Sequence, residues 1–119
     1  MNRGDVYTLG NTKFPDGTVR AKHAVFVCGQ HIPGTNGNGQ VSVVIANTDR
    51  RKLPRRPAHP YEAELGVVDG FAHDTLIDCR WVPVKTWDEL QKAQFLLTLN
   101  EGAMRRIDRA IYEGLQLDP

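Results

Sequence analysis

Two oppositely charged residues, Asp78 and Arg80, stand two positions apart inside the largely apolar run from Leu76 to Pro83. If that run is a strand, both side chains project from the same face. Their backbones then lie roughly 7 Å apart, close enough for the carboxylate and the guanidinium to meet. Such a pair can hold a phosphate or exchange a proton with a substrate, and it can equally be a structural ion pair. Residue type and spacing leave both interpretations open.

A second group of polar residues follows the apolar run from Val41 to Ala46, which is typical of a central strand. Thr48 and Asp49 come directly after this run, and five of the 15 Lys and Arg residues follow within seven positions. These five are Arg50, Arg51, Lys52, Arg55 and Arg56. Pro54 and Pro57 stiffen the segment, and the guanidinium group suits phosphate recognition. The segment is predicted either to contact phosphate or nucleic acid, or to be a solvated connector.

An earlier segment, residues 11–20, contains the turn signal Pro15-Asp16-Gly17 and is predicted to be a loop. A loop of this length on a small domain often carries function. The groups it could deliver to a substrate are Lys13, Asp16, Arg20, Lys22 and His23, and Asp16 is expected to be a solvated loop charge.

The overall composition is that of one globular domain, residues 1–119. Hydrophobic residues make up 40% of the chain, charged residues 24%, and the formal net charge is only +1. A chain of this length buries roughly two thirds of its unfolded surface and needs no disulfide or metal for stability. The basic residues are concentrated in one segment, so their distribution says more about partners than the net charge does.

Both cysteines, Cys28 and Cys79, lie in apolar runs, which predicts buried, reduced thiols and a cytoplasmic protein. The sequence contains no apolar run of 18 residues and no signal peptide, so a membrane partner and secretion are not expected. Cys28 and His31 have a Cys-x-x-His spacing, but no second pair accompanies them. No metal site and no cofactor are therefore predicted.

The remaining elements follow from periodicity and capping. Strands are expected at residues 6–9, 24–28, 41–46, 59–65 and 76–83, and alternation in the fifth puts Ile77, Cys79 and Trp81 on one face. Residues 94–99 are expected to form another strand or the end of a short helix. Thr86 and Glu89 form a capping box for a short helix. Asn100 is the predicted N-cap of a second, amphipathic helix over residues 101–117. Together these elements predict a mainly β, α+β fold, a small, strongly curved barrel or two-sheet structure closed by the C-terminal helix.

Five stretches of the sequence, taken in order, resemble one known family. They are RGDVYTL, AVFVC, SVVIANTD, LIDCRWVPVKTWDEL and LTLNEGAMRRIDRAIYEGLQL. This order and spacing resemble the MazF, PemK and Kid family of toxins from bacterial toxin–antitoxin modules over nearly the whole chain. The resemblance implies an SH3-like antiparallel barrel that forms a homodimer. It also implies an endoribonuclease that cuts single-stranded RNA without a metal and is silenced by a cognate antitoxin.

The resemblance also implies roles for particular residues. Thr48 matches a strand-end threonine of the family, Asp78 and Arg80 match a catalytic Arg and Asp in reversed order, and His23 stands where the family has a proline. In the family the ribose 2′-OH attacks the phosphodiester, leaving a cyclic phosphate and a 5′-OH. For this reaction the predicted catalytic residues are Arg80, Asp78, Thr48 and His23. The predicted RNA-binding residues are Lys13, Arg20, Lys22, Asp49, Arg50, Arg51, Lys52, Arg55 and Arg56.

A second function remains open on the same barrel, because the order of Asp78 and Arg80 and the first loop depart from the family pattern. The protein would then be a binding protein without catalytic activity. It would be either a toxin that inhibits a protein target, as the related CcdB gyrase poisons do, or an RNA-binding relative from a phage or mobile element.

Overall fold

The computed structural model describes residues 2–13, 15, 17, 19–29, 39–47, 57–72 and 74–116, without the side chains of residues 10–13, 19–21, 29, 47, 87 and 91. Seven strands form one antiparallel sheet in the order β4-β5-β3-β2-β1-β7, and β6 also pairs with β3. The strands are β1 (Asp5–Lys13), β2 (Val19–Gly29), β3 (Gln40–Asn47), β4 (Glu62–Leu65), β5 (Thr75–Asp78), β6 (Val84–Thr86) and β7 (Gln94–Thr98). A 3-10 turn (Val67–Asp69), α1 (Trp87–Gln91) and α2 (Glu101–Leu115) complete the fold.

One edge of β3 is shared by two strands, and this sharing bends the sheet. β5 pairs with the C-terminal end of β3 through Ala46 and Ile77, whereas β6 pairs with its N-terminal end through Ser42 and Val84. Residues 79–83 lie between the two pairings, held to β3 by one backbone hydrogen bond of 3.0 Å from Val43 N to the Pro83 carbonyl. The chain therefore leaves β5 in a turn before it joins β3 again as β6.

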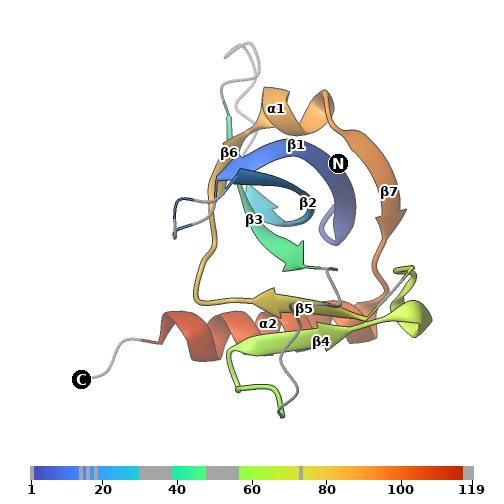
Figure 1. Ribbon diagram of the computed structural model, residues 1–119, viewed down its shortest axis with the longest axis vertical. Coiled ribbons are helices and arrows are strands. Elements are labelled where there is room, and N and C mark those ends of the chain that lie inside the picture. The colour runs from blue at the N-terminus through green and yellow to red at the C-terminus, as the bar shows by residue number, and fades with distance from the viewer. Residues whose placement is uncertain are drawn as a thin grey trace.

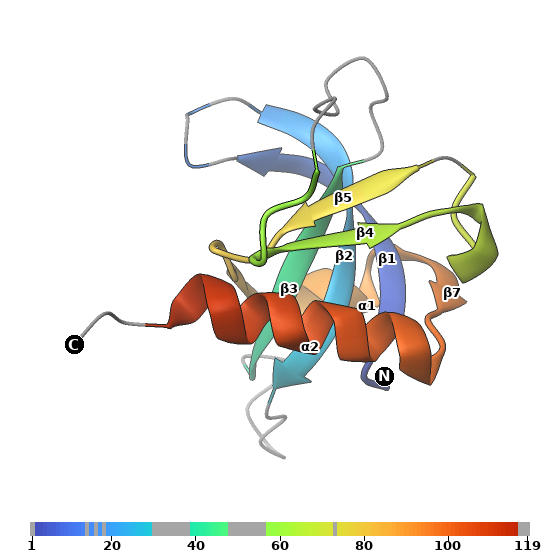
Figure 2. The ribbon, with the colours of Figure 1, turned by 90° about the horizontal axis from the view of Figure 1, so that it is seen from below.

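The two faces of the sheet carry two separate hydrophobic clusters. The larger one joins β1, β2, β3, β4 and β5 to the buried side of α2, and the fully buried Ile77 and Ile107 belong to it. The smaller one lies on the other face, where Ile45 and Phe26 pack with Leu90 of α1. Figure 1 shows α1 and α2 on opposite sides of the curved strands, and Figure 2 shows α2 running along β4 and β5.

The opening Arg3-Gly4-Asp5 ties the start of the chain to three other elements. Arg3 donates to the Val27 carbonyl at the end of β2 and pairs with Asp108 of α2. The buried carboxylate of Asp5 accepts from Thr98 Oγ1 of β7 at 2.6 Å and from Asn2 N at 2.7 Å. Gly4 has φ +94°, a conformation that residues with a Cβ rarely adopt. These three residues therefore have a structural role.

Most expected elements are confirmed, although β1 and β2 are longer than their apolar runs. β1 continues to Lys13, and β2 begins at Val19. The register of their pairing shifts between Leu9 and Asn11, where β1 has a bulge. The capping box is present, because Glu89 N donates to Thr86 Oγ1 and Thr86 N to Glu89 Oε1. α2 begins after Asn100, whose side chain accepts from Ala103 N at 2.8 Å. β6 was not expected, since Val84–Thr86 is too short for a periodic pattern.

Two expectations about side-chain position are wrong. Trp81 packs on the α1 side and not with Ile77 and Cys79, because β5 ends at Asp78 and the chain turns at the next two residues. Cys28 is exposed, because the β2–β3 register shifts between Phe26 and Cys28. Both cysteines are free thiols, as expected.

The antiparallel, mainly β fold with a C-terminal helix is confirmed, and closure into a barrel remains a prediction. Within the described residues, β4 and β7 are the two ends of the strand order, and no pairing joins them. No helix in the described residues is both long enough and apolar enough to cross a membrane.

The contact between α2 and the end of β5 generates a prediction about Gly114. A Cβ at this position would lie 2.6 Å from the Cys79 carbonyl oxygen and 2.9 Å from Arg80 N. Alanine is a better helix former than glycine by about 1 kcal/mol, but forcing apart two packed backbones costs about 1–3 kcal/mol. We expect Gly114→Ala to lower the free energy of unfolding, measured by urea denaturation.

Gly102→Ala, in the same helix, is the matched control. Its Cβ would meet only Asn100 Oδ1, at 3.5 Å, so the substitution should leave stability unchanged or raise it by up to about 1 kcal/mol. Equal effects of the two substitutions would show that the Gly114 contact does not limit the packing of α2.

Candidate functional site

The predicted contact between Asp78 and Arg80 is present. Arg80 Nε donates to Asp78 Oδ1 at 3.1 Å and Nη2 donates to Oδ2 at 2.7 Å, which is a two-point contact. Arg80 N also donates to Asp78 Oδ1 at 3.0 Å, so the turn after β5 is closed by the same carboxylate. Within the described residues Nη1 of Arg80 donates no hydrogen bond, so this edge of the guanidinium can donate to a ligand.

This contact decides the ionisation of Asp78. Burial works to raise the pKa of Asp78, but the hydrogen bonds from Arg80, together with its charge and that of His59, outweigh burial and lower the pKa. The carboxylate is therefore ionised at neutral pH and is a weak base. Its clearest effect is to fix the direction of Arg80.

Two further residues, which the sequence analysis did not select, complete the surroundings of Arg80. The guanidinium carbon lies 4.1 Å from the centre of the Tyr61 ring, a cation–π contact. The ring of His59 stacks on the same tyrosine, with ring centres 5.0 Å apart and planes at 24°. The motif His-Pro-Tyr directly before a strand was the available signal, but only the pairing of β4 with β5 brings it to Arg80.

His23 lies on the other face of the sheet from Asp78. His23 pairs with Ala46, which pairs with Ile77, and directly paired residues point to the same side of a sheet. Asp78, one residue beyond Ile77, therefore points away from the His23 side. The structure does not bring His23 together with Asp78 and Arg80.

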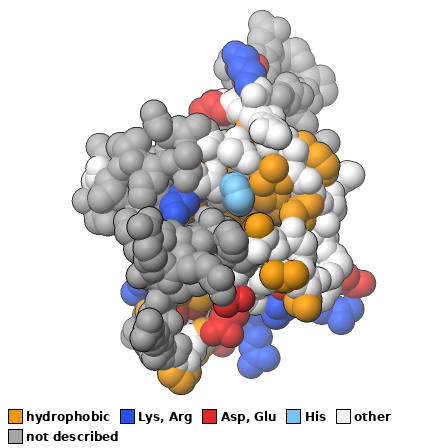
Figure 3. Space-filling view, turned by 45° about the vertical axis from the view of Figure 1, so that its right-hand side comes forward, with side chains coloured by type: hydrophobic (Ala, Val, Ile, Leu, Met, Phe, Trp, Pro, Cys, Tyr) orange, Lys and Arg blue, Asp and Glu red, His pale blue; other side chains and the backbone are white. Residues whose placement is uncertain are grey.

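The surroundings of His23 are apolar. Its ring stacks on Phe71 with ring centres 6.3 Å apart, and its Nδ1 is buried without a hydrogen-bond partner among the described residues. Burial, and then the charge of Lys22, lower the pKa of His23 below its ordinary value. Figure 3 shows a histidine side chain among hydrophobic side chains on one face of the molecule.

Lys22 is on the same sheet face as Asp78, because it is adjacent to His23 along β2. It is a buried residue opposite Leu9 of β1, and its backbone lies roughly 12 Å from that of Asp78. Lys13 and Arg20 lie in the β1–β2 ladder, as partners of Val19 and Thr12. The other predicted site residues lie outside the described residues: Thr48, Asp49, Arg50, Arg51, Lys52, Arg55 and Arg56.

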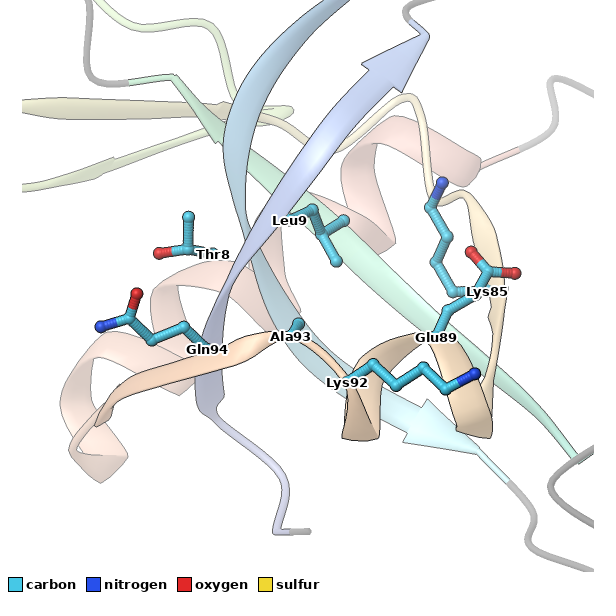
Figure 4. Close-up of a pocket in the computed structure, with 7 residues that line it drawn as sticks. All are labelled: Thr8, Leu9, Lys85, Glu89, Lys92, Ala93 and Gln94. Atoms are coloured by element: carbon cyan, nitrogen blue, oxygen red, sulfur yellow. The ribbon is translucent and has the colours of Figure 1, made fainter.

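Two hollows lie on the surface of the described residues. One, of about 330 Å³, lies between β1 and α1, with Lys85, Glu89 and Lys92 around Leu9 and Ala93 (Figure 4). Lys92 is already paired with Asp88 at 2.9 Å. Of the predicted catalytic residues that the structure describes, none lines this hollow. The second, of about 320 Å³, lies between β4 and α2, with His59 on one wall and Arg109 on the other. Among the described side chains, no three His, Cys, Asp or Glu residues form a metal-binding group.

Comparison with solved structures identifies the fold. A mycobacterial endoribonuclease in complex with its cognate antitoxin matches with TM-score 0.64 and 19% identity, over 95% of this chain and 92% of that chain. A second mycobacterial endoribonuclease matches with TM-score 0.64 and 20% identity, over 95% and 88% of the two chains. A chain of the MazE–MazF crystal structure from Deinococcus radiodurans matches with TM-score 0.60 and 13% identity, over 98% of this chain and 94% of that chain. No protein-family model and no curated protein matches the sequence.

The chain therefore has the fold of the MazF-like toxins, as the resemblance implied. At identities of 20% or less these matches establish the fold and leave the activity to be argued from the site.

The two thiols are expected to differ in reactivity. Burial, and then the negative charge of Asp78, raise the pKa of Cys79 to about 12, so this thiol stays protonated and inert at neutral pH. Cys28 is exposed. A thiol reagent should modify one cysteine per folded chain and two after denaturation, and Cys28→Ser should remove the fast reaction. Labelling of folded Cys28→Ser would contradict the packing of Cys79 under α2.

His23 should make stability depend on pH. Because its pKa is lower in the folded chain than the ordinary value of about 6.5, the unfolded chain binds the proton first, and stability falls as pH decreases below about 6.5. His23→Phe keeps a flat ring against Phe71 and removes the titration. Urea midpoints at pH 7.5 and 5.5 should therefore fall less in the variant than in the native protein. An identical fall in both would show that His23 is not the cause.

Proposed function

We propose that this protein is a toxin-like, metal-independent endoribonuclease that cleaves single-stranded RNA. The reaction would be attack of the ribose 2′-OH on the neighbouring phosphodiester, leaving a cyclic phosphate and a 5′-OH. We further propose that residues 1–119 form one domain whose sheet closes into an SH3-like barrel. The observation that carries the proposal is the oriented guanidinium of Arg80, in a fold shared with endoribonucleases.

Arg80 supplies the electrostatic part of this reaction. Negative charge develops on the phosphorus oxygens in the transition state, and fixed donors aimed at it lower the barrier. Two of the donors of Arg80 hold Asp78, and the free Nη1 edge is available to the phosphate. A guanidinium already held in one orientation loses little entropy when it binds.

Asp78 is in this scheme a positioning residue for Arg80 and the nearer of the two predicted proton acceptors. A phosphate on Arg80 is on the Asp78 face of the sheet, whereas His23 is on the opposite face. The lowered pKa keeps Asp78 ionised, so it can accept the 2′ proton, but only as a weak base. Thr48 is proposed to help position the phosphate from the end of β3.

The proposed partners follow from the fold and the basic segment. Lys13, Arg20, Lys22, Asp49 and the five cations of residues 50–56 would contact the RNA, and the cations would supply the long-range attraction. The matched endoribonuclease and MazF are each seen with an antitoxin, which supports a cognate antitoxin as a partner here. A homodimer and a cytoplasmic location are part of the same proposal.

One observation favours the second candidate function, an RNA-binding protein that does not cut. Both oxygens of Asp78 are occupied by Arg80 hydrogen bonds, which weakens it as a proton acceptor. Binding without cleavage would need only the donors of Arg80 and the basic segment.

The test is incubation of the purified protein with a long single-stranded RNA in EDTA, followed by mapping of new ends. We expect discrete cuts with 5′-hydroxyl ends. Arg80→Ala should lower the cleavage rate roughly 100- to 1000-fold, the effect of removing one donor to the developing charge. Asp78→Asn, which keeps one acceptor for the guanidinium but removes the acceptor of the 2′ proton, should also lower the cleavage rate.

Arg105→Ala is the control, because the Arg105 side chain on α2 is even more exposed than that of Arg80 (76% against 57%) and, within the described residues, pairs with Glu101 at 2.9 Å. It should cut RNA at the native rate. If the native protein leaves the RNA intact, the nuclease proposal is wrong. Binding of that RNA would then favour the second function. Equal cleavage rates for Arg80→Ala and Arg105→Ala would show that Arg80 is not part of the active site.

A further inference from the structure

Three flat side chains lie in contact beside the proposed phosphate site. The ring of His59 stacks on Tyr61, and the guanidinium of Arg80 lies over the same tyrosine ring, 4.1 Å from its centre. His59 and Arg80 are both exposed, and Tyr61 is half-buried between the turn and β5. Flat aromatic and guanidinium groups are the surfaces on which proteins stack unpaired bases.

The turn that carries His59 is fixed in place. His59 N donates to Glu62 Oε1 at 2.8 Å, and Glu62 N donates back to the His59 carbonyl at 2.9 Å. Pro60 lies inside this turn and restricts its backbone further. Beyond it, Cys79 N donates to the Tyr61 carbonyl at 2.9 Å, which joins the turn to the residue before Arg80. The imidazole is therefore presented on a rigid support, which lowers the entropy lost on binding.

The local charges favour stacking over attraction of phosphate at this position. Glu62 pairs directly with Asp78 in the β4–β5 ladder, so a second carboxylate lies beside the Asp78–Arg80 pair. The described part of this surface is therefore not strongly basic. A neutral, flat base is not repelled by these carboxylates, whereas an additional phosphate would be repelled.

We infer that His59, supported by Tyr61, forms the binding site for an unpaired nucleobase next to the phosphate held by Arg80. The inference rests on the proposed function, because it takes single-stranded RNA as the ligand. The base stacks on the exposed imidazole and lengthens the series of contacts that runs from Arg80 through Tyr61 to His59. Arg80 thereby joins the base site to the phosphate site.

Binding of two probes separates the base from the backbone. The first is an eight-nucleotide single-stranded RNA with 2′-O-methyl groups, which block attack by the 2′ oxygen. The second has the same number of phosphates and no bases. By fluorescence anisotropy, His59→Ala should weaken binding of the first probe roughly 5- to 100-fold and leave binding of the second unchanged. Tyr61→Leu should act in the same direction, and the urea midpoint of each variant checks that it is folded.

His59→Phe is the matched variant, because it keeps a flat ring and removes the nitrogens. It should bind the first probe within a few-fold of the native protein. The inference is overturned if His59→Ala binds the first probe as tightly as the native protein does, or if it binds both probes more weakly by the same factor. It is also overturned if His59→Phe loses as much affinity for the first probe as His59→Ala does.

Cleavage of unmodified RNA by the same proteins distinguishes this inference from the proposed function. If binding of the first probe depends on the His59 ring and the native protein does not cleave RNA, the base site is supported and the nuclease proposal is wrong. If the native protein cleaves RNA and probe binding does not change on substitution of His59, the nuclease proposal is supported and the base site is wrong.

Discussion

The contact between the last turn of α2 and the chain just after β5 is the constraint on which the candidate site depends. At Gly114 the two backbones approach so closely that no Cβ fits between the helix and the Cys79 carbonyl. Ile77 and Cys79 are buried under the helix by this approach, and Asp78 is directed to the other side. The same turn releases the chain from β3 until β6 begins, and Arg80 belongs to this released segment. Packing on one face thus sets the chemistry of the other.

The polar groups around Arg80 illustrate how a surface ion pair can matter for function while adding little stability. Exposed pairs of this kind contribute about 0–1 kcal/mol to folding, and both Arg80 and Asp78 are about half exposed. The contribution of this pair is to orient the guanidinium of Arg80. Two hydrogen bonds and one aromatic ring restrict the guanidinium to one orientation, so its free edge faces outward before any ligand arrives. The lowered pKa of Asp78 keeps this arrangement intact at neutral pH.

The structure separates positions that need a particular residue type from positions that need only an apolar side chain. The opening Arg3-Gly4-Asp5 links β2, β7 and α2, and the two helix caps fix where α1 and α2 begin. Such positions need a particular residue type because a donor, an acceptor or a positive φ is required. Core positions require only apolar residues of suitable volume, and many sequences satisfy that requirement. Identity of 13–20% over nearly the full chain is consistent with this division.

The sequence alone determined the elements whose signals are local. Alternation in residues 61–65, the Thr86–Glu89 capping box, the Asn100 cap and the meeting of Asp78 with Arg80 all depend on neighbours within a few positions. Tertiary structure alone decided which side chains share a face across strands. It separated His23 from Arg80, moved Trp81 to the α1 side, and brought His59 and Tyr61 to the site. The physical reason is that strand register and turns after a strand are set by long-range packing, and a shift of one residue reverses the face of every side chain.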